Sequence, residues 1–273
     1  MPELPEVEMV ARGLREPLTG RRVTGLWSDW PRVMHSPEQE EFAARIDGQV
    51  FQSIVRRGKY LLCALDTETL IVHLRMTGRL YVAADEAHFD ADRWVHFRLQ
   101  LDGGQQLRFS DARKFGRVWL TPDPATVTGA LGPEPLSRQF TSRWLRGRLE
   151  ERSRAIKPLL LDQAFLAGVG NIYADEALHR ACIHPLRPAN SLDQAEAAAL
   201  HRALRAALRA GIAHEGASIN WYRKPDGSRG DSQSHFRVYG RAGQPCPRCG
   251  APVEKTVVAQ RGTHFCARCQ PPP

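Results

Sequence analysis

The chain contains 273 residues, of which 42% are hydrophobic and 25% are charged, and this composition excludes a disordered chain or a fibre. A chain of this length forms one large domain or two smaller ones, and we expect two. No apolar run approaches the ~20 residues that cross a bilayer. The N-terminus is acidic and interrupted by proline, unlike a secretion signal, so we expect a cytoplasmic protein.

The charge balance is basic, with 38 Lys and Arg against 30 Asp and Glu, a net charge of +8 and a pI near 9.5. This excess favours a polyanionic partner such as nucleic acid or an anionic membrane surface, although it also fits a merely basic soluble protein. Residues 210–273 hold nine Lys or Arg against four Asp or Glu. That local excess favours a docking surface.

The first predicted element is a helix over residues 5–16, because Pro5 suits a first helical turn and apolar residues follow at helical spacing. From about Val23 to Leu120, short segments of strand-like composition alternate with turns rich in Gly, Asp and charged residues. This pattern predicts a β-sandwich or barrel-like domain.

Residues 121–135 are rich in Pro and Gly and predict a linker between domains. Helical patterns then dominate until about Ala213: one around Trp144, a second from Ile156, and a third that carries Leu200, Leu204 and Leu208 on one face. Ser191 and Gln194 have the spacing of a capping box at the start of the third helix.

Four of the six cysteines fall in the last 28 residues, as two Cys-x-x-Cys pairs: Cys246, Cys249, Cys266 and Cys269. This spacing predicts one structural zinc ion rather than disulfides or a chance cluster. The residues between the pairs read as a β-hairpin with Arg261 at its tip, either as a positioned cation or as a solvated turn residue. We expect domains over residues 1–130, 131–240 and 241–273.

The segment "GVGNIY" (168–173) is not a dinucleotide fingerprint, because Tyr173 stands where the third glycine is needed and no strand precedes it. Gly168 and Gly170 instead suit a tight turn before a helix start, where backbone N–H groups bind phosphate. Asn171 adds a side-chain donor there. The alternative is a turn that merely packs the helices.

Three segments of the first half combine cations with a turn. "RRGKYL" places Lys59 at a strand start, "HLRMTG" places Met76 in a turn after His73, and "DARKFG" places Phe115 beside Arg113. Apolar side chains in basic loops are what a protein needs to wedge between stacked bases. Taken singly, each segment is more often explained by ordinary packing or a solvated strand end.

The opening "MPELPEVE" has an ordinary structural explanation, because Pro5 suits the start of a helix and Glu6 and Glu8 favour the positive end of its dipole. A proline after Met1 has a second explanation, since removal of Met1 leaves a secondary amine at the terminus.

Taken together and in this order, "MPELPEVE", "RRGKY", "HLRMTG", "DARKFG", "GVGNIYADEALHRACIHP" and the four-cysteine element resemble the bacterial formamidopyrimidine-DNA glycosylase family. The resemblance spans essentially the whole chain. It implies an α+β fold of two domains: an N-terminal helix on a β-sandwich, then a helix–two-turn–helix domain with a zinc-finger hairpin. It also implies a monomeric base-excision repair enzyme that acts on double-stranded DNA, removes oxidised purines such as 8-oxoguanine, and cuts the strand by β,δ-elimination.

The resemblance also implies roles for residues that match the family's motifs. Pro2 resembles the nucleophile, Glu3 an acid that transfers protons, Glu6 a residue that supports the site, and Lys59 the active-site lysine. The residues that resemble DNA contacts are His73, Met76, Arg113, Phe115, Lys157, Asn171, Tyr239 and Arg261.

Two alternatives remain at this point. One is the sister endonuclease VIII type, which acts on oxidised pyrimidines, although Leu4 and "DARKFG" favour purines. The other is a zinc-finger DNA-binding protein without catalysis. Lys114 stands where many relatives have a second arginine. Residues 218–236 lie where the family has a variable lesion-covering loop, but they do not align with it residue by residue, so the sequence leaves lesion preference open.

Overall fold

The computed structural model describes residues 1–84 and 92–273. Contacts divide the chain into two units. The first contains Met1–Ala130 and Glu215–Asp231, and the second contains Leu131–His214 and Ser232–Pro273. The expected division into three consecutive parts therefore differs from these units in two ways: Glu215–Asp231 packs with the N-terminal part, and the four-cysteine element packs with the helices.

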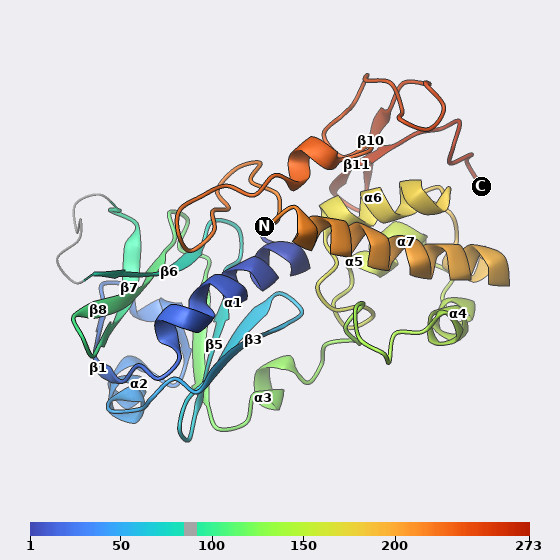
Figure 1. The fold of residues 1–273 in the computed structure, drawn as a ribbon. Coiled ribbons are helices and arrows are strands. Elements are labelled where there is room, and N and C mark those ends of the chain that lie inside the picture. Colours follow the sequence, from blue (N-terminus) through green and yellow to red (C-terminus); the bar gives the residue numbers. More distant parts are fainter. Residues whose placement is uncertain (85–91) are drawn as a thin grey trace. The chain divides into compact units, whose positions relative to one another are not determined.

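The first unit is a sandwich of two sheets with flanking helices, as Figure 1 shows. One sheet has the order β1-β7-β8-β6, with bounds Val23–Ser28, Val95–Leu101, Gln105–Ser110 and Arg79–Ala84. The other has the order β2-β9-β5-β4-β3, with bounds Met34–Ser36, Arg117–Thr121, Thr69–His73, Tyr60–Ala64 and Ser53–Arg57. All neighbouring strands are antiparallel except β2 and β9, which are parallel. The predicted β-sandwich is confirmed.

Two helices cover the edges of the sandwich. Helix α1 (Leu4–Leu18) packs against β3 and β6, and α2 (Gln39–Ile46) packs against β1 and β2. Because these are the edge strands of the two sheets, the helices cover edges that would otherwise be exposed to other chains. The apolar face of α1 is buried in the core shared by both sheets, at Val7, Val10, Ala11, Leu14 and Leu18.

The predicted linker is more ordered than a plain loop, because the short helix α3 (Ala125–Thr128) lies within it. The second unit contains α4 (Ser142–Glu150), α5 (Ile156–Leu161), α6 (Asn171–Ala181) and α7 (Gln194–Ala213). Three short 3-10 helices complete the secondary structure of the described residues: η1 (Pro31–Val33), η2 (Ala189–Ser191) and η3 (Ser232–His235).

The start of α7 corrects one sequence-based expectation. The N-cap is Asp193, which forms a capping box with Glu196, and not Ser191 with Gln194. The Asp193 carboxylate accepts the Glu196 N–H at 2.8 Å, and the Glu196 carboxylate accepts the Asp193 N–H at 2.9 Å. Ser191 belongs to η2, where its hydroxyl donates to the Pro188 carbonyl. Two overlapping capping-box patterns occur here, and the carboxylate of Asp193 is the stronger acceptor.

The C-terminal hairpin pairs β10 (Glu254–Val258) with β11 (Arg261–Phe265). Its turn consists of Ala259 and Gln260, both with positive φ, so Arg261 is the first residue of the returning strand. The hairpin packs on α6. No helix within residues 1–84 and 92–273 is long and apolar enough to cross a membrane.

Candidate DNA-repair site

The N-terminus is held in place through Glu6. Glu3 is the N-cap of α1, and its backbone N–H donates to Glu6 Oε2 at 2.8 Å. The second oxygen, Glu6 Oε1, accepts the Ala217 N–H at 2.8 Å. Both glutamates are at most 3% exposed. One carboxylate therefore ties the start of the chain to the segment Glu215–Asp231.

That segment is itself ordered by internal contacts. The Tyr222 hydroxyl donates to the Glu215 carbonyl at 3.1 Å, and the Ser218 hydroxyl accepts the Gly230 N–H at 3.0 Å. Burial raises the pKa of Tyr222, and the Glu6 carboxylate raises it further. Gly216 has a φ of +80, and a Cβ there would approach Glu6 to 3.0 Å, so this position favours glycine.

Lys59 follows Gly58 in the turn between β3 and β4, and it is 5% exposed. The next residue, Tyr60, is the register partner of His73, and the two rings meet edge to face at 4.6 Å. His73 Nδ1 accepts the Arg75 N–H at 3.0 Å. Burial lowers the pKa of His73 to about 3, and the charges of Arg75 and Lys59 contribute, so the ring is a neutral imidazole.

The proposed wedge residues come together on two neighbouring turns. Met76 follows β5 and Phe115 precedes β9, and these side chains are 44% and 46% exposed. Arg113 joins them: its Nη1 lies 3.2 Å from Met76 Sδ, and its Cζ lies 4.7 Å from the centre of the Phe115 ring. The structure therefore presents two apolar side chains and one cation as a single cluster.

A buried aspartate that sequence analysis missed holds these two turns. Asp111, which is 1% exposed, accepts the backbone N–H groups of Arg113, Phe115 and Gly116 at 3.2, 2.8 and 2.7 Å. It also accepts the hydroxyl hydrogen of Thr77, the residue after Met76. The available signal was the Asp that opens "DARKFG", a residue type that commonly accepts nearby backbone N–H groups in turns.

In the second unit, the expected phosphate-binding residues lie around one hairpin. The turn before α6 contains Gly168 with φ +86, and Asn171 is the first residue of the helix. Asn171 Nδ2 donates to the Gly262 carbonyl at 2.8 Å, next to Arg261. Arg261 is exposed. The tight turn, the helix start and the hairpin cation are thus brought together.

The side chain of Lys157, which sequence analysis lists among the residues that resemble DNA contacts, is fully buried. Its ammonium lies 2.6 Å from Asp175 Oδ1 and donates to Thr263 Oγ1 at 2.7 Å and the Gly262 carbonyl at 3.2 Å. Asp175 Oδ2 in turn accepts the His264 N–H at 2.9 Å. In this structure Lys157 positions the strand that begins at Arg261.

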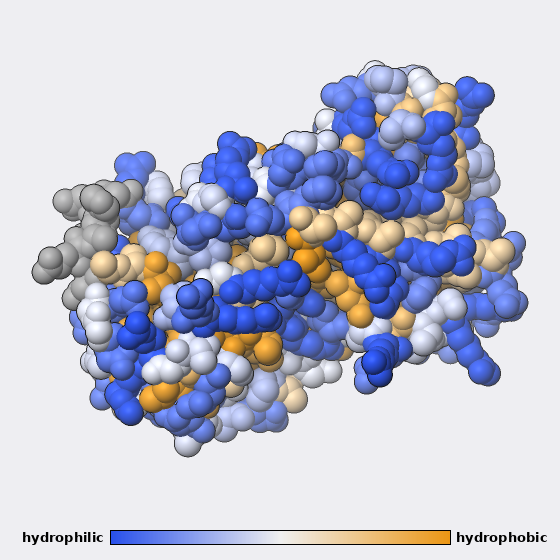
Figure 2. Space-filling view, in the orientation of Figure 1, coloured by the Kyte–Doolittle hydropathy of each residue, from blue (hydrophilic) through white to orange (hydrophobic). Residues whose placement is uncertain are grey.

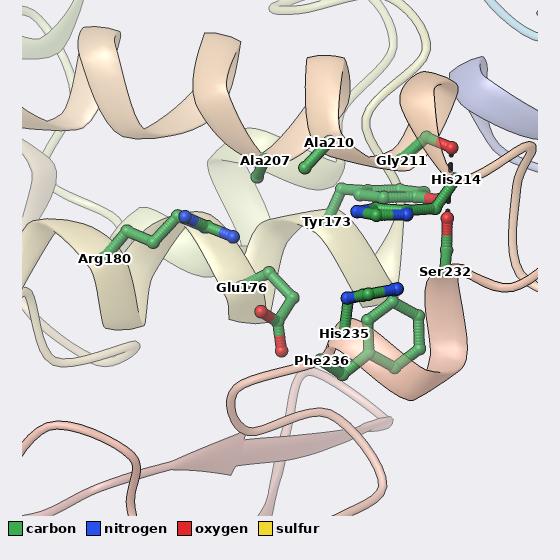
Figure 3. Close-up of a pocket in the computed structure, with 10 residues that line it drawn as sticks. All are labelled: Tyr173, Glu176, Arg180, Ala207, Ala210, Gly211, His214, Ser232, His235 and Phe236. Carbon is green, nitrogen blue, oxygen red and sulfur yellow. Dashed lines mark hydrogen bonds between the residues drawn. The ribbon is translucent and has the colours of Figure 1, made fainter.

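Tyr239 is partly buried beside the same hairpin, with its ring 5.0 Å from the His264 ring. Its backbone is held by Glu176 of α6, whose carboxylate accepts the N–H groups of Arg237, Val238 and Tyr239 within 3.0 Å. Figure 3 shows this glutamate beside α7 residues and the stacked rings of His214 and His235, whose centres lie 3.5 Å apart.

The four cysteines of the two pairs form the cluster that the spacing predicted. Their sulfur atoms all lie within 4.8 Å of one another, at 3.9 Å for Cys246 and Cys269 and 3.5 Å for Cys249 and Cys266. Four thiolates ~2.3 Å from a tetrahedral zinc ion are ~3.8 Å apart, so the cluster fits one structural zinc. His179 supports it from α6, with Nε2 3.2 Å from Cys246 Sγ.

The fold and these sites define a helix–two-turn–helix DNA-binding protein with a structural zinc finger and a buried, acidic N-terminal site. Three family models match in order: the formamidopyrimidine-DNA glycosylase N-terminal domain over residues 1–118, its H2TH domain over 131–223, and the zinc finger found in FPG and IleRS over 243–272. The chain belongs to the formamidopyrimidine-DNA glycosylase family.

Comparison with individual proteins supports the same family assignment. Proteins named formamidopyrimidine-DNA glycosylase from Herpetosiphon aurantiacus and Chloroflexus aurantiacus are 52% and 50% identical, each over 99% of this chain and 100% and 98% of their own. The Lactococcus lactis Fpg in complex with abasic-site DNA superposes with a TM-score of 0.92 at 37% identity, over 99% of this chain and all of that one. The Thermus thermophilus MutM (FPG) protein gives 0.89 at 42%, over 98% of both chains. A MutM complex with carbocyclic 8-oxo-G DNA gives 0.91 at 38%, over 99% and 100%.

Proposed function

We propose that this chain is a base-excision repair DNA glycosylase with AP lyase activity, which removes oxidised purines such as 8-oxoguanine and formamidopyrimidines from duplex DNA. The observation that carries the proposal is the arrangement of the N-terminus. The Glu6 carboxylate binds both the backbone N–H of Glu3, the residue after Pro2, and the backbone N–H of Ala217. The family membership and the DNA-bound structural relatives support it.

Pro2 supplies the nucleophile once Met1 is removed. An α-amino group has a lower ordinary pKa than a lysine ammonium, so more of it is neutral and nucleophilic near neutral pH. Its attack on the sugar carbon that bears the base displaces the base, and opening of the sugar ring at the same carbon then gives a covalent iminium. The iminium acts as an electron sink for β,δ-elimination of the phosphates. Glu3, the adjacent residue, transfers protons in these steps, a contribution typically of ~10²–10⁴ in rate.

The exposed cluster of Met76, Arg113 and Phe115 supplies the wedge. A base inside a duplex is out of reach of the amine, so the nucleotide flips out at a cost of a few kcal/mol. The two apolar side chains fill the gap, and Arg113 offers hydrogen bonds to the base left behind, a cytosine.

The remaining polar residues bind the DNA backbone. This role falls to His73, Asn171, Tyr239 and Arg261, whereas Lys59 is the active-site lysine, near the lesion and its phosphate. Lys157 acts by positioning the Arg261 strand, through its contacts with Gly262 and Thr263. One zinc ion on the four cysteines stabilises the hairpin, since closed four-thiolate sites are structural. The enzyme works as a monomer on DNA in the cytoplasm, associated with the nucleoid.

Borohydride trapping tests the nucleophile. Reduction of the enzyme mixed with a duplex that contains 8-oxoguanine opposite cytosine should give a covalent adduct, which mass spectrometry should locate on Pro2. A tag retained before Pro2 should abolish trapping and strand cleavage together. An adduct on Lys59, or full activity of the tagged protein, would contradict the assignment.

Two matched substrates separate the alternatives. An endonuclease VIII type enzyme would cut a duplex with an oxidised pyrimidine faster than one with an oxidised purine. A zinc-finger protein without catalysis would bind both and cut neither. We expect cleavage of the oxidised-purine duplex to be the faster.

A further inference from the structure

A groove of about 320 Å³ in the second unit is surrounded by four arginines from four different segments. Arg180 lies in the last turn of α6, Arg202 lies on α7, Arg237 follows η3, and Arg248 lies between the first two cysteines of the cluster. We call this feature the arginine groove. None of the residues assigned above to DNA or to chemistry lines it.

The positive charge of the arginine groove is not neutralised by the chain. Within residues 1–84 and 92–273, none of the four guanidinium groups forms an ion pair with a carboxylate. Arg248 donates to the Cys182 sulfur and, at 3.1 Å, to the Arg180 carbonyl, which leaves its charge uncompensated. Arg180 Nε is buried and has no hydrogen-bond partner in the described part of the chain.

Glu176, four residues before Arg180 on α6, is the carboxylate whose charge raises the pKa of Arg180; Figure 3 shows both residues. Its carboxylate is already engaged by three backbone N–H groups, those of Arg237, Val238 and Tyr239. Burial lowers the pKa of Arg180, the charge of Arg237 lowers it further, and Glu176 raises it. Guanidinium groups held together in this way favour an anion from outside the chain.

Helix electrostatics explains one of these arginines but not the others. A cation in the last turn of α6 is stabilised by the negative end of the helix dipole, which accounts for Arg180. Arg202 lies in the middle of α7, and Arg237 and Arg248 lie outside helices, so the dipole gives no reason for them. The helix dipole therefore does not explain why these three arginines line one groove, whereas binding of an anionic partner does.

The floor of the arginine groove is apolar. Ala199, Ala203 and Ala206 line it from one face of α7, at a spacing of four and three residues. Alanine side chains are short, so they leave a hollow between the longer arginines. Figure 2 shows the same mixture at the surface, with hydrophilic residues over much of the second unit and paler hydrophobic atoms between them.

The arginine groove is also distant from the turn before α6, where Asn171 is an expected phosphate contact. Asn171 begins α6 and Arg180 lies nine positions later, which corresponds to ~14 Å along the helix axis. Phosphate contacts require exposed cations and gain nothing from a floor of alanines. A peptide segment with a carboxylate next to an apolar side chain contacts both the arginines at the rim of the groove and the alanines at its floor.

We propose that the arginine groove binds an acidic segment of a partner protein, in which Asp or Glu residues flank an apolar side chain. The carboxylates pair with Arg202 and Arg237 at the rim, and the apolar side chain rests on Ala199, Ala203 and Ala206. Such a contact recruits the enzyme to other proteins while its DNA-binding residues stay free.

Fluorescence anisotropy with the zinc-loaded full chain tests the proposal. The probe is a short fluorescein-labelled peptide in which Glu and Leu alternate. Two matched peptides carry Gln in place of Glu, or Ser in place of Leu. The groove variant is Arg202→Gln/Arg237→Gln, and the control variant with the same charge change is Arg143→Gln/Arg209→Gln, at exposed positions of α4 and α7 outside the groove.

The groove variant should bind the Glu-Leu peptide at least about tenfold more weakly than the control variant, because two charge-assisted contacts are lost. Both matched peptides should bind weakly to the unaltered chain, and both variants should cut lesion-bearing duplex at the unaltered rate. Zinc content and thermal melting verify folding, and Arg202→Gln alone, at an exposed position, repeats the test if the double variant misfolds.

Three results would overturn the proposal. Equal weakening in groove and control variants would show general charge attraction. Equal binding of the Ser and Leu peptides would remove the role of the alanine floor. A loss of duplex binding in the groove variant, with peptide binding unchanged, would make the groove part of the DNA surface.

Discussion

The hydroxyl of Thr77 donates its hydrogen to the carboxylate of Asp111, and this bond joins two turns that are 34 positions apart in sequence. Met76 precedes the donor, and Arg113 and Phe115 follow the acceptor. The arrangement of the exposed side chains of Met76, Arg113 and Phe115 thus depends on the buried hydrogen bond between Thr77 and Asp111. Asp111 acts as a positioning residue for the wedge.

Asp111→Asn should loosen the two turns that hold the proposed wedge residues, because an amide accepts through one oxygen and places an NH₂ group against backbone N–H donors. We expect ~2–3 kcal/mol of lost stability and a smaller preference for 8-oxoguanine opposite cytosine over adenine. Urea unfolding and single-turnover excision measure the two effects. Asp102→Asn, at an exposed position in the same unit, is the control. An unchanged base preference would exclude a positioning role.

Glu6→Gln should loosen the segment Glu215–Asp231. The amide retains one acceptor oxygen, so either the Glu3 N–H or the Ala217 N–H loses its partner. Hydrogen exchange at Ala217 should accelerate by about tenfold or more, which corresponds to ~1.4 kcal/mol. Glu8→Gln, in the next turn of α1, is the control. Equal exchange in both variants would contradict the role given to Glu6.

Lys157→Met should cost about 3–5 kcal/mol of stability, because it leaves Asp175 buried without its cation. Lys157→Met/Asp175→Leu should recover part of this loss, since both charges are gone. The exposed pair of Arg154 and Asp162 is the comparison, where Arg154→Gln should cost less than ~1 kcal/mol. Thermal unfolding and duplex binding are the measurements. Equal losses in the two single variants would refute the buried-pair account.

Falling pH should destabilise the first unit through His73. The unfolded ring accepts a proton near pH 6.5, whereas the folded ring accepts one near pH 3. Stability should therefore be intact above pH 6.5, decline as the pH falls, and level off below about 3, with a loss of roughly 3 kcal/mol near pH 4. His73→Gln should reduce this loss in urea unfolding, and the exposed His35→Gln should not. The same pH dependence in His73→Gln would exclude His73 as its source.

Removal of zinc should abolish duplex binding while the β-sandwich stays folded. Besides the cysteines, the small core around the cluster is formed by Val238 and Val253, so the hairpin depends on the metal for its folding energy. Cys249→Ala should lose the bound zinc, measured by metal analysis, and Cys182→Ser should retain it. Normal lesion binding by metal-free protein would contradict this prediction.

Local patterns in the sequence predicted much of the fold. Helical spacing identified α1, and strand-like segments identified the sandwich, because each signal lies within a few neighbouring residues. The cysteine pairs identified the zinc cluster for the same reason. The family resemblance, rather than periodicity, supplied the helix–two-turn–helix arrangement and the roles of the site residues.

What the sequence did not reveal depends on contacts between distant residues. The burial of Lys157 follows from Asp175 and Thr263, 18 and 106 positions away, which no local pattern connects. The bond between Glu6 and Ala217 spans 211 positions. Asp111 and Glu176 likewise look like ordinary polar residues until the fold brings backbone donors to them.

The first unit is assembled from two stretches of chain, and synthesis delivers them at different times. Helix α1 and both sheets leave the ribosome well before Glu215–Asp231, so Glu6 meets Ala217 late in translation. Until then Glu6 lacks its bond to Ala217, and the nascent N-terminus is accessible to a peptidase, as the proposed removal of Met1 requires. The order of residues along the chain thus separates, in time, the proposed processing of the terminus from the formation of this contact.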